Sequence, residues 1–79
     1  MKLAQAVGKR VKELLFKKNI TQYRLCKTTC LSEKTIRDLI RNKTSDIKLS
    51  TIFLMLDVFE MSLTEFFDSP LFDKKDIEI

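Results

Sequence analysis

Residues 32–41 place four charged side chains on one side of a short predicted helix. These are Lys34, Arg37, Asp38 and Arg41. At 100° per residue, the apolar residues lie on the opposite side and are expected to face a core, namely Ile36, Leu39 and Ile40. Long cationic side chains donate hydrogen bonds to phosphates and base edges, and the major groove of B-DNA accommodates a helix. The pattern predicts a DNA-reading helix, and an ordinary solvated helix face is the alternative that this segment alone leaves open.

Two hydroxyl residues mark where the helices around this segment begin. Thr21 opens a helix predicted for residues 21–28, and Ser32 opens the one at residues 32–41. Each has an apolar residue before it and another four residues after it, the arrangement of a hydrophobic staple around an N-cap. Only residues 29–31 connect the two helices, which is too short for anything but a sharp helix-turn-helix.

Charge is divided unevenly along the chain. Residues 1–48 contain thirteen Lys and Arg against four acidic residues, a net charge of +9. Residues 49–79 contain two Lys against seven acidic residues, a net charge of −5. A basic half suits a polyanion and an acidic half stays clear of it, while a basic surface that is merely solvated is the alternative.

A first helix is predicted for residues 2–18. Apolar residues recur there at helical spacing and are expected to face the core: Leu3, Val7, Val11 and Leu14. Basic residues are expected to fill the outer face: Lys9, Arg10, Lys12, Lys17 and Lys18. Gly8 has low helix propensity and is expected where another helix packs closely, and Asn19 is expected to end the helix in the left-handed conformation.

Two further helices follow a polar loop at residues 42–48. The fourth, at residues 49–59, has an expected core face made of Leu49, Ile52, Phe53, Leu56 and Phe59. Other apolar residues widen its surface, so this helix is expected to be central or to be covered by a second subunit. Ser62 and Glu65 form a capping box that begins a fifth helix, which ends near Asp68, before Pro70.

Composition limits the class of protein. The chain has 79 residues, 44% of them hydrophobic, with one Gly and one Pro, which suits one small all-α domain at residues 1–69 with a tail at residues 70–79. It contains no run of membrane-spanning length and no signal-peptide pattern, so we expect a cytoplasmic protein. It has no His, no evident carboxylate pair and no phosphate-binding loop, so we expect no enzyme, cofactor, metal or small-molecule ligand.

Cys26 and Cys30 are the two cysteines of the chain. They lie four residues apart on or beside one short helix, so they cannot join distant segments. We expect two buried thiols, in preference to a redox switch.

Several segments, read in order, resemble the lambda-repressor-like helix-turn-helix family, and in particular its small regulators of the xenobiotic-response-element type. They are VGKRVKELL, ITQYRL, LSEKTIRDLI and KLSTIFLMLDVFEMSLTEFF, within residues 7–67. The resemblance implies an all-α, five-helix DNA-binding domain whose second and third helices form the helix-turn-helix. It also implies a homodimer that occupies a short palindromic operator and controls transcription, as a repressor.

The resemblance also implies which residues contact DNA. Gln22 corresponds to a glutamine at the start of the second helix that commonly bonds a phosphate. The positions for base edges and adjacent phosphates correspond to Ser32, Glu33, Lys34, Thr35, Arg37 and Asp38. The segment that usually approaches the DNA backbone after the third helix corresponds to Arg41, Asn42 and Lys43.

The chain departs from the family pattern at several of these positions. Cys26 stands where Ala is frequent, Ile40 where Glu is frequent, and Cys30 where Gly is usual in the turn. A residue with a β-carbon is strained at that turn if a positive φ is kept. Glu33 and Asp38 could accept hydrogen bonds from cytosine N4 or hold neighbouring cations in place, and the second role is favoured.

The expected dimer contact lies on the fourth and fifth helices and the tail. Its residues are Leu54, Met55, Val58, Phe66, Leu71 and Phe72. A protein-interaction module on the same scaffold, such as a partner that neutralises a toxin, is the alternative to a DNA-binding regulator.

Overall fold

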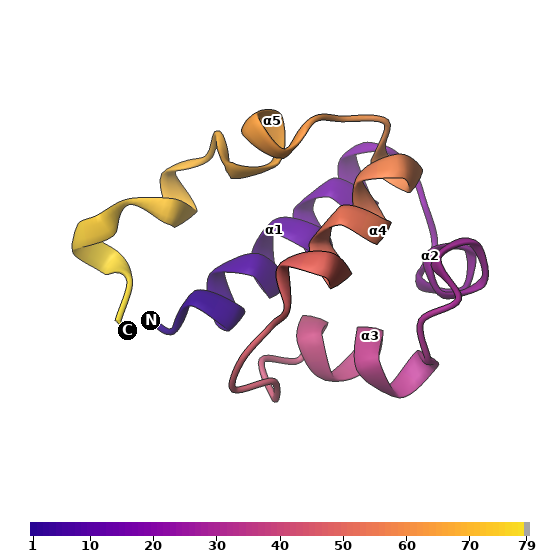
Figure 1. The fold of residues 1–79 in the computed structure, drawn as a ribbon, viewed down its shortest axis with the longest axis horizontal. Coiled ribbons are helices and arrows are strands. Elements are labelled where there is room, and N and C mark those ends of the chain that lie inside the picture. Colours follow the sequence, from indigo (N-terminus) through magenta and orange to yellow (C-terminus); the bar gives the residue numbers. More distant parts are fainter. Residues whose placement is uncertain (79) are drawn as a thin grey trace.

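The computed structural model describes residues 1–78 as a chain of helices (Figure 1). The α-helices are α1 (Leu3–Lys17), α2 (Gln22–Thr29), α3 (Glu33–Ile40), α4 (Leu49–Phe59) and α5 (Leu63–Phe67). Two 3-10 helices follow, η1 (Pro70–Phe72) and η2 (Lys74–Asp76). The predicted all-α architecture is confirmed, and every α-helix begins and ends within one residue of its predicted limits. In residues 1–78, no helix is both long enough and apolar enough to cross a membrane.

Side-chain caps begin the helices where the sequence predicted them. Thr21 Oγ1 and Ser32 Oγ each accept a hydrogen bond from the backbone N–H three residues later, at 3.0 and 3.1 Å. Ser62 and Glu65 complete a capping box, with both hydrogen bonds at 3.1 Å. The backbone N–H of Ser62, followed by its hydroxyl group, lowers the pKa of the Glu65 carboxyl. An N-cap of this kind is typically worth about 1 kcal/mol.

Left-handed residues end each of the first four helices. Asn19 (φ 54°), Cys30 (φ 61°), Asn42 (φ 60°) and Glu60 (φ 54°) lie at or just after the helix ends. Asn adopts this conformation more readily than most residues, whereas other side chains pay roughly 1–2 kcal/mol for it. The left-handed Asn19 and the unfavourable φ at Cys30 are confirmed.

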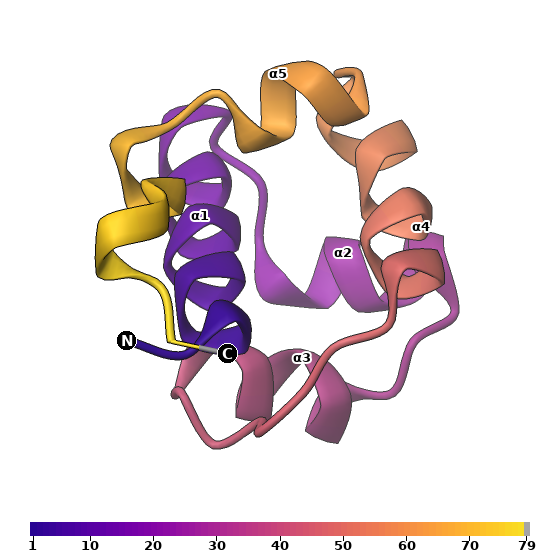
Figure 2. The same ribbon diagram turned by 60° about the vertical axis from the view of Figure 1, so that its left-hand side comes forward.

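The helices surround one core, as Figure 2 shows with α1 and α4 on opposite sides and α3 below. Its largest fully buried side chains are Phe59, Phe66, Leu25, Ile36, Leu39 and Met55. Gly8 is the point at which α1 meets α3, because a β-carbon there would collide with the carbonyl oxygen of Leu39. The close packing expected at Gly8 is therefore confirmed.

Arg10 was expected on the outer face of α1, but its side chain is buried. Its Nε donates to the carbonyl oxygen of Phe66 at 2.8 Å, and a terminal nitrogen donates to that of Glu65 at 2.9 Å. The other terminal nitrogen pairs with the carboxylate of Glu13. Carbonyls at a helix end need partners from outside the helix, so Arg10 fastens the end of α5 to α1. Leu3 differs in the other direction, since it was expected in the core and is exposed.

The buried side of α4 also differs from the prediction. Leu49 and Phe53, expected in the core, are 55% and 50% exposed. Met55 and Val58, expected at a dimer contact, are buried in the core of the single chain, as is Phe66. These three residues are unavailable to a partner, and the set predicted for the dimer contact is wrong for them.

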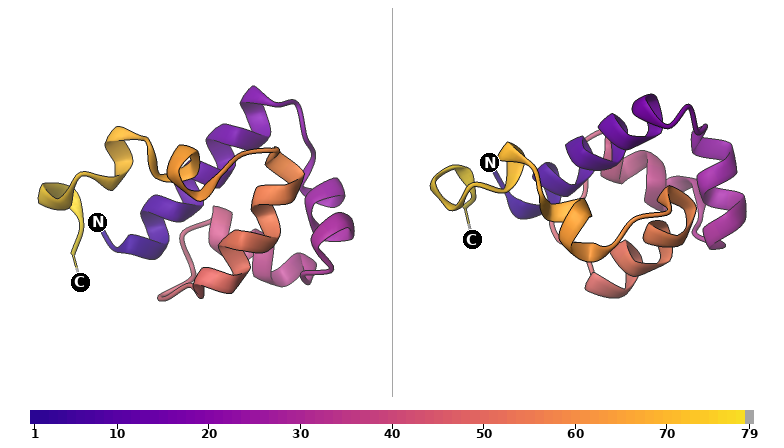
Figure 3. Two further views of the ribbon diagram at one scale, coloured as in Figure 1. Left: turned by 45° about the horizontal axis from the view of Figure 1, so that its top comes forward. Right: turned by 90° about the horizontal axis from the view of Figure 1, so that it is seen from above.

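Residues 70–78 fold back along α1, so the two ends of the described chain lie side by side (Figure 3). The ring of Phe72 lies 4.7 Å from that of Phe67 and 6.1 Å from that of Phe66, measured between centroids. The backbone N–H of Glu78 donates to the carbonyl of Met1 at 2.8 Å. The tail therefore packs on the domain, with Leu71 and Phe72 half-buried against it. Ile79, its last residue, lies outside the described residues.

Candidate nucleic-acid interface

α3 lies at the surface with one side buried. Ile36 and Leu39 are buried and Ile40 is half-buried against the core, as predicted. The opposite side is exposed and carries Glu33, Lys34, Thr35 and Arg37, with Asp38 half-buried beside them. α3 is therefore a short helix, capped by Ser32, whose free surface is polar and mostly charged.

The first turn of α3 is held by hydroxyl groups. Ser32 Oγ lies 2.7 Å from Thr35 Oγ1, in addition to accepting from the Thr35 backbone N–H. Glu33 is exposed in the same turn, where a negative charge interacts favourably with the helix dipole. These contacts fix the backbone at the N-terminal end of α3, where the first N–H groups of a helix have no partner within the helix.

One ion pair crosses the outer face of α3. Lys34 Nζ lies 3.2 Å from Asp38 Oδ2, one helical turn away. An exposed pair of this type contributes only a few tenths of a kcal/mol, so the ammonium is easily transferred to a stronger anion. Within residues 1–78, Arg37 forms no ion pair. The geometry fits the role favoured for Asp38, which is to hold a neighbouring cation.

α2 and α3 meet in a cleft of about 220 Å³. It is lined by Gln22, Tyr23, Cys26, Glu33 and Arg37. The predicted phosphate-binding Gln22 is thus brought beside two residues of α3 that were predicted to contact DNA. Glu33 and Arg37 lie at the exposed side of this cleft, and Cys26 is buried.

The two thiols of α2 lie in different environments. Cys26 is buried, and burial, followed by the nearby Glu33 carboxylate, raises the pKa of its thiol, which disfavours the reactive thiolate. Cys30 is exposed, so the expectation of two buried thiols is wrong for this residue. The left-handed φ at Cys30 turns the chain sharply from α2 toward α3 and leaves its side chain in solvent.

The chain leaves α3 through a tight turn. The backbone N–H of Lys43 donates to the carbonyl of Asp38 at 2.8 Å, and that of Asn42 donates to Leu39 at 3.3 Å. These bonds close the end of the helix in the manner of a Schellman motif. The exposed side chains of Arg41, Asn42 and Lys43 therefore project directly beyond α3.

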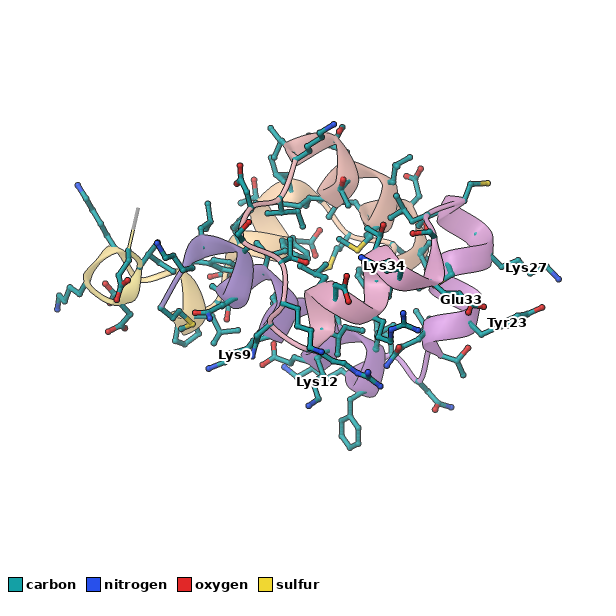
Figure 4. All side chains as sticks on the ribbon, turned by 90° about the horizontal axis from the view of Figure 1, so that it is seen from below. Lys9, Lys12, Tyr23, Lys27, Glu33 and Lys34 are labelled. Atoms are coloured by element: carbon teal, nitrogen blue, oxygen red, sulfur yellow. The ribbon has the colours of Figure 1, made fainter. Side chains whose placement is uncertain are left out.

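Figure 4 shows further side chains beside α3 that the sequence did not assign to a site. Lys34 of α3 lies between Lys9 and Lys12 of α1 on one side and Tyr23 and Lys27 of α2 on the other. Lys27 Nζ lies 5.5 Å from the centroid of the Tyr23 ring and 3.5 Å from its hydroxyl oxygen. The only sequence signal for that pair was its spacing of four residues on one helix.

The ten residues predicted to contact DNA are all at the surface, nine of them exposed and Asp38 half-buried. They form a continuous series, from Gln22 in the cleft, along the outer face of α3, to residues 41–43 beyond its end. Their contact with DNA remains a prediction. Residues 1–78 contain no group of three or more side chains placed to bind a metal ion.

Comparison with known proteins agrees with this geometry. A family model described as the Cro/C1-type HTH DNA-binding domain matches residues 10–70, which include the helix-turn-helix and α4 and α5. No curated protein and no solved structure shows a significant match to the chain. Since the matched residues make up well over half of the sequence, the chain belongs to the Cro/C1-type helix-turn-helix DNA-binding domains.

Proposed function

We propose that the protein is a homodimeric transcriptional repressor that inserts α3 of each subunit into the major groove of a palindromic operator. The observation that carries this proposal is the outer face of α3. Lys34 and Arg37 extend from a helix whose opposite side is buried and whose first turn is fixed by Ser32. Such a helix has a backbone held in place by the core and long side chains that can donate hydrogen bonds to base edges, which is what base recognition in the major groove requires.

Contacts to the DNA backbone are proposed at both ends of this face. Gln22 lies at the first position of α2 and shares the cleft with α3, so its amide can donate to a phosphate on one strand. Arg41 and Lys43 are exposed beyond the end of α3 and form no ion pair within residues 1–78. We assign these cations to phosphates near the other end of α3. Phosphate contacts fix the register in which α3 meets the bases.

The division of charge supports a fixed orientation on DNA. α5 lies on the opposite side of the molecule from α3, and the tail lies at one end of the molecule (Figure 1); five of the seven acidic residues of the C-terminal half lie in residues 61–79. DNA attracts the side that carries α3 and repels the opposite side. The net charge of +4 therefore understates the attraction on the side of α3.

The proposed dimer contact is the exposed apolar face of α4. Leu49, Phe53 and Leu54 are 55%, 50% and 47% exposed, and they follow one another along the free side of the helix. Leu71 and Phe72 lie in η1, which packs on α1 and not on α4, so they are left out of the proposed contact. A two-fold dimer would place the two α3 helices about 34 Å apart, one turn of B-DNA.

Selection of bound sequences from random DNA duplexes tests this proposal. We expect a palindromic consensus and specific affinity that exceeds random-duplex affinity by a factor of 10³ or more. Analytical ultracentrifugation of the same complexes is expected to give two protein chains per duplex. If no duplex is enriched and affinity is the same for every sequence, the proposal fails, and a protein-interaction module on this scaffold becomes the better explanation.

A further inference from the structure

A line of exposed residues on α1 is not used by the proposed helix-turn-helix contacts. Lys9, Lys12 and Phe16 lie within about 60° of one another around the helix axis. All three are exposed, and Phe16 is 88% exposed, which is the highest value among the large apolar residues of the described chain. An aromatic ring this exposed beside two cations suggests a surface that is covered in a complex.

This surface lies directly beside α3. Gly8 contacts the backbone of Leu39, and Lys9 and Lys12 follow it on the exposed side of α1. Lys12 and Phe16 line a surface hollow of about 610 Å³ together with Gln22 and Ile40. The line Lys9–Lys12–Phe16 therefore runs from the end of α3 toward the start of α2, and both of these places are proposed phosphate contacts.

The cations of this surface have no internal anion. Within residues 1–78 neither Lys9 nor Lys12 forms an ion pair, whereas Lys17 lies 3.8 Å from Glu13. Phe16 also lines a second, shallow apolar hollow with the side chains of Lys9, Lys12, Glu13 and Lys17. Unpaired ammonium groups beside an apolar surface match the alternation of phosphates and deoxyribose rings along a DNA strand.

We propose that Lys9, Lys12 and Phe16 form an additional DNA contact, on the sugar–phosphate backbone that flanks the operator half-site. The two lysines bind neighbouring phosphates, and the ring of Phe16 packs on the deoxyribose that follows the phosphate bound by Lys12. This inference rests on the proposed DNA-binding function of α3. Because the contact involves the backbone alone, it increases affinity equally for all sequences and lengthens the protected stretch of DNA.

A charge-matched pair of double variants tests this contact. The variant Lys9→Ala with Lys12→Ala is compared with Lys74→Ala with Lys75→Ala, which removes the same charge from the exposed tail. Affinities for the selected operator and for a random duplex are measured across a series of salt concentrations. We expect the α1 variant to lower the slope of log affinity against log salt by about 2, and to weaken both duplexes roughly 30-fold at 0.15 M salt. The tail variant is expected to change the slope by much less than 1.

Two further measurements separate the ring from the charges. Phe16→Ala is expected to weaken binding a few-fold with an unchanged salt slope, because the ring releases no counterion. Hydroxyl-radical footprinting is expected to lose protection at the flanks of the site in the α1 double variant, while the centre stays protected. If the wild type binds its operator but the two double variants give the same slope and footprint, this inference is wrong and the proposed function stands. If the wild type itself prefers no sequence, the proposed function fails first.

Discussion

α3 and α4 pack on the same core but expose opposite kinds of side chain. The free face of α3 carries the cations Lys34 and Arg37, and the free face of α4 carries the apolar Phe53 and Leu54. Exposure of a cation to water costs little free energy, and a cation that binds a polyanion releases counterions. An exposed apolar face, in contrast, is stabilised when another surface covers it. The difference supports the proposal that the two helices face different partners, with DNA at α3 and a second copy of the chain at α4.

The largest effect is expected from changing the free face of α4. The double substitution Phe53→Gln with Leu54→Gln keeps the charge and removes the apolar contact from both subunits. Burial of one such side chain is worth about 1.5–3 kcal/mol, so the dimer dissociation constant is expected to rise by more than roughly 100-fold. Sedimentation equilibrium measures this change, and operator affinity is expected to fall with it.

Ser50→Gln is the control for this variant, because Ser50 is also exposed on α4 and is already polar. It is expected to leave the dimer unchanged. At protein concentrations low enough for the wild type and both variants to be monomeric, all three are expected to have about the same Tm, since the substituted side chains are exposed in the single chain. Dimerisation that survives the Phe53 and Leu54 substitutions would exclude α4 as the contact.

On α3, Lys34→Ala tests whether the cationic face reads bases. If Lys34 leaves Asp38 and donates to a base edge, the substitution should cost about 1–3 kcal/mol on the selected operator and much less on a random duplex. Paired titrations of the two duplexes measure the difference. Asp38→Asn is the companion variant, and it should strengthen binding slightly, because it removes an anion from the DNA-facing side and a competing partner of Lys34 whose surface pair contributes only a few tenths of a kcal/mol. Equal losses on both duplexes for Lys34→Ala would make Lys34 a backbone contact.

Lys43→Ala probes the end of the α3 face, where only phosphate contact is expected. Loss of one phosphate contact should lower the salt slope by about 1 and weaken both duplexes by roughly fivefold at 0.15 M salt. A salt series on the operator and on a random duplex measures both quantities, with Lys74→Ala in the tail as the control. A loss confined to the operator would show instead that Lys43 contributes to sequence reading.

The helix limits and the surface of α3 could be predicted because their causes are local. Thr21, Ser32 and Ser62 cap helices through bonds to residues three positions away, and Asn19 adopts a conformation that Asn tolerates. On α3 the apolar and charged residues separate clearly onto opposite sides of the helix, so the sequence determined which side is buried and which is exposed. Such features depend on a few neighbouring residues and are largely independent of how the rest of the chain packs.

The burial of Arg10 and the orientation of α4 could not be predicted in this way. The partners of Arg10 include carbonyls of Glu65 and Phe66, which are more than fifty positions away and have no side-chain signature. α4 is apolar almost all round, so its periodicity fits more than one buried side. Packing against α2 and α5 selected the side with Met55 and Val58, which left Phe53 exposed. The sequence predicted a dimer contact on this helix that includes Leu54, but only the structure adds Leu49 and Phe53 to it and removes Met55 and Val58.

The smallest effect is expected at the turn between α2 and α3, where neither free face is altered. Cys30 holds φ at 61°, a conformation that Gly adopts without a steric penalty. Cys30→Gly relieves that penalty but increases the freedom of the unfolded chain, so the net gain should be up to about 1 kcal/mol. For a domain of this size a gain of 1 kcal/mol corresponds to a rise of about 4–8 °C in Tm.

Two control variants show whether φ is the cause of this gain. Cys30→Ala removes the sulfur but keeps the β-carbon, so it should give no increase in Tm. Asn19→Gly relieves a smaller penalty, because Asn already tolerates a positive φ, and should give less than Cys30→Gly. Thermal unfolding followed by circular dichroism gives all three values, and dimerisation and operator affinity should stay at wild-type levels. A lower Tm for Cys30→Gly than for Cys30→Ala would show that relief of φ does not offset the added freedom of the unfolded chain. A change in dimerisation at unchanged stability would show instead that the turn influences the α4 face, and that the surfaces of α3 and α4 are not independent.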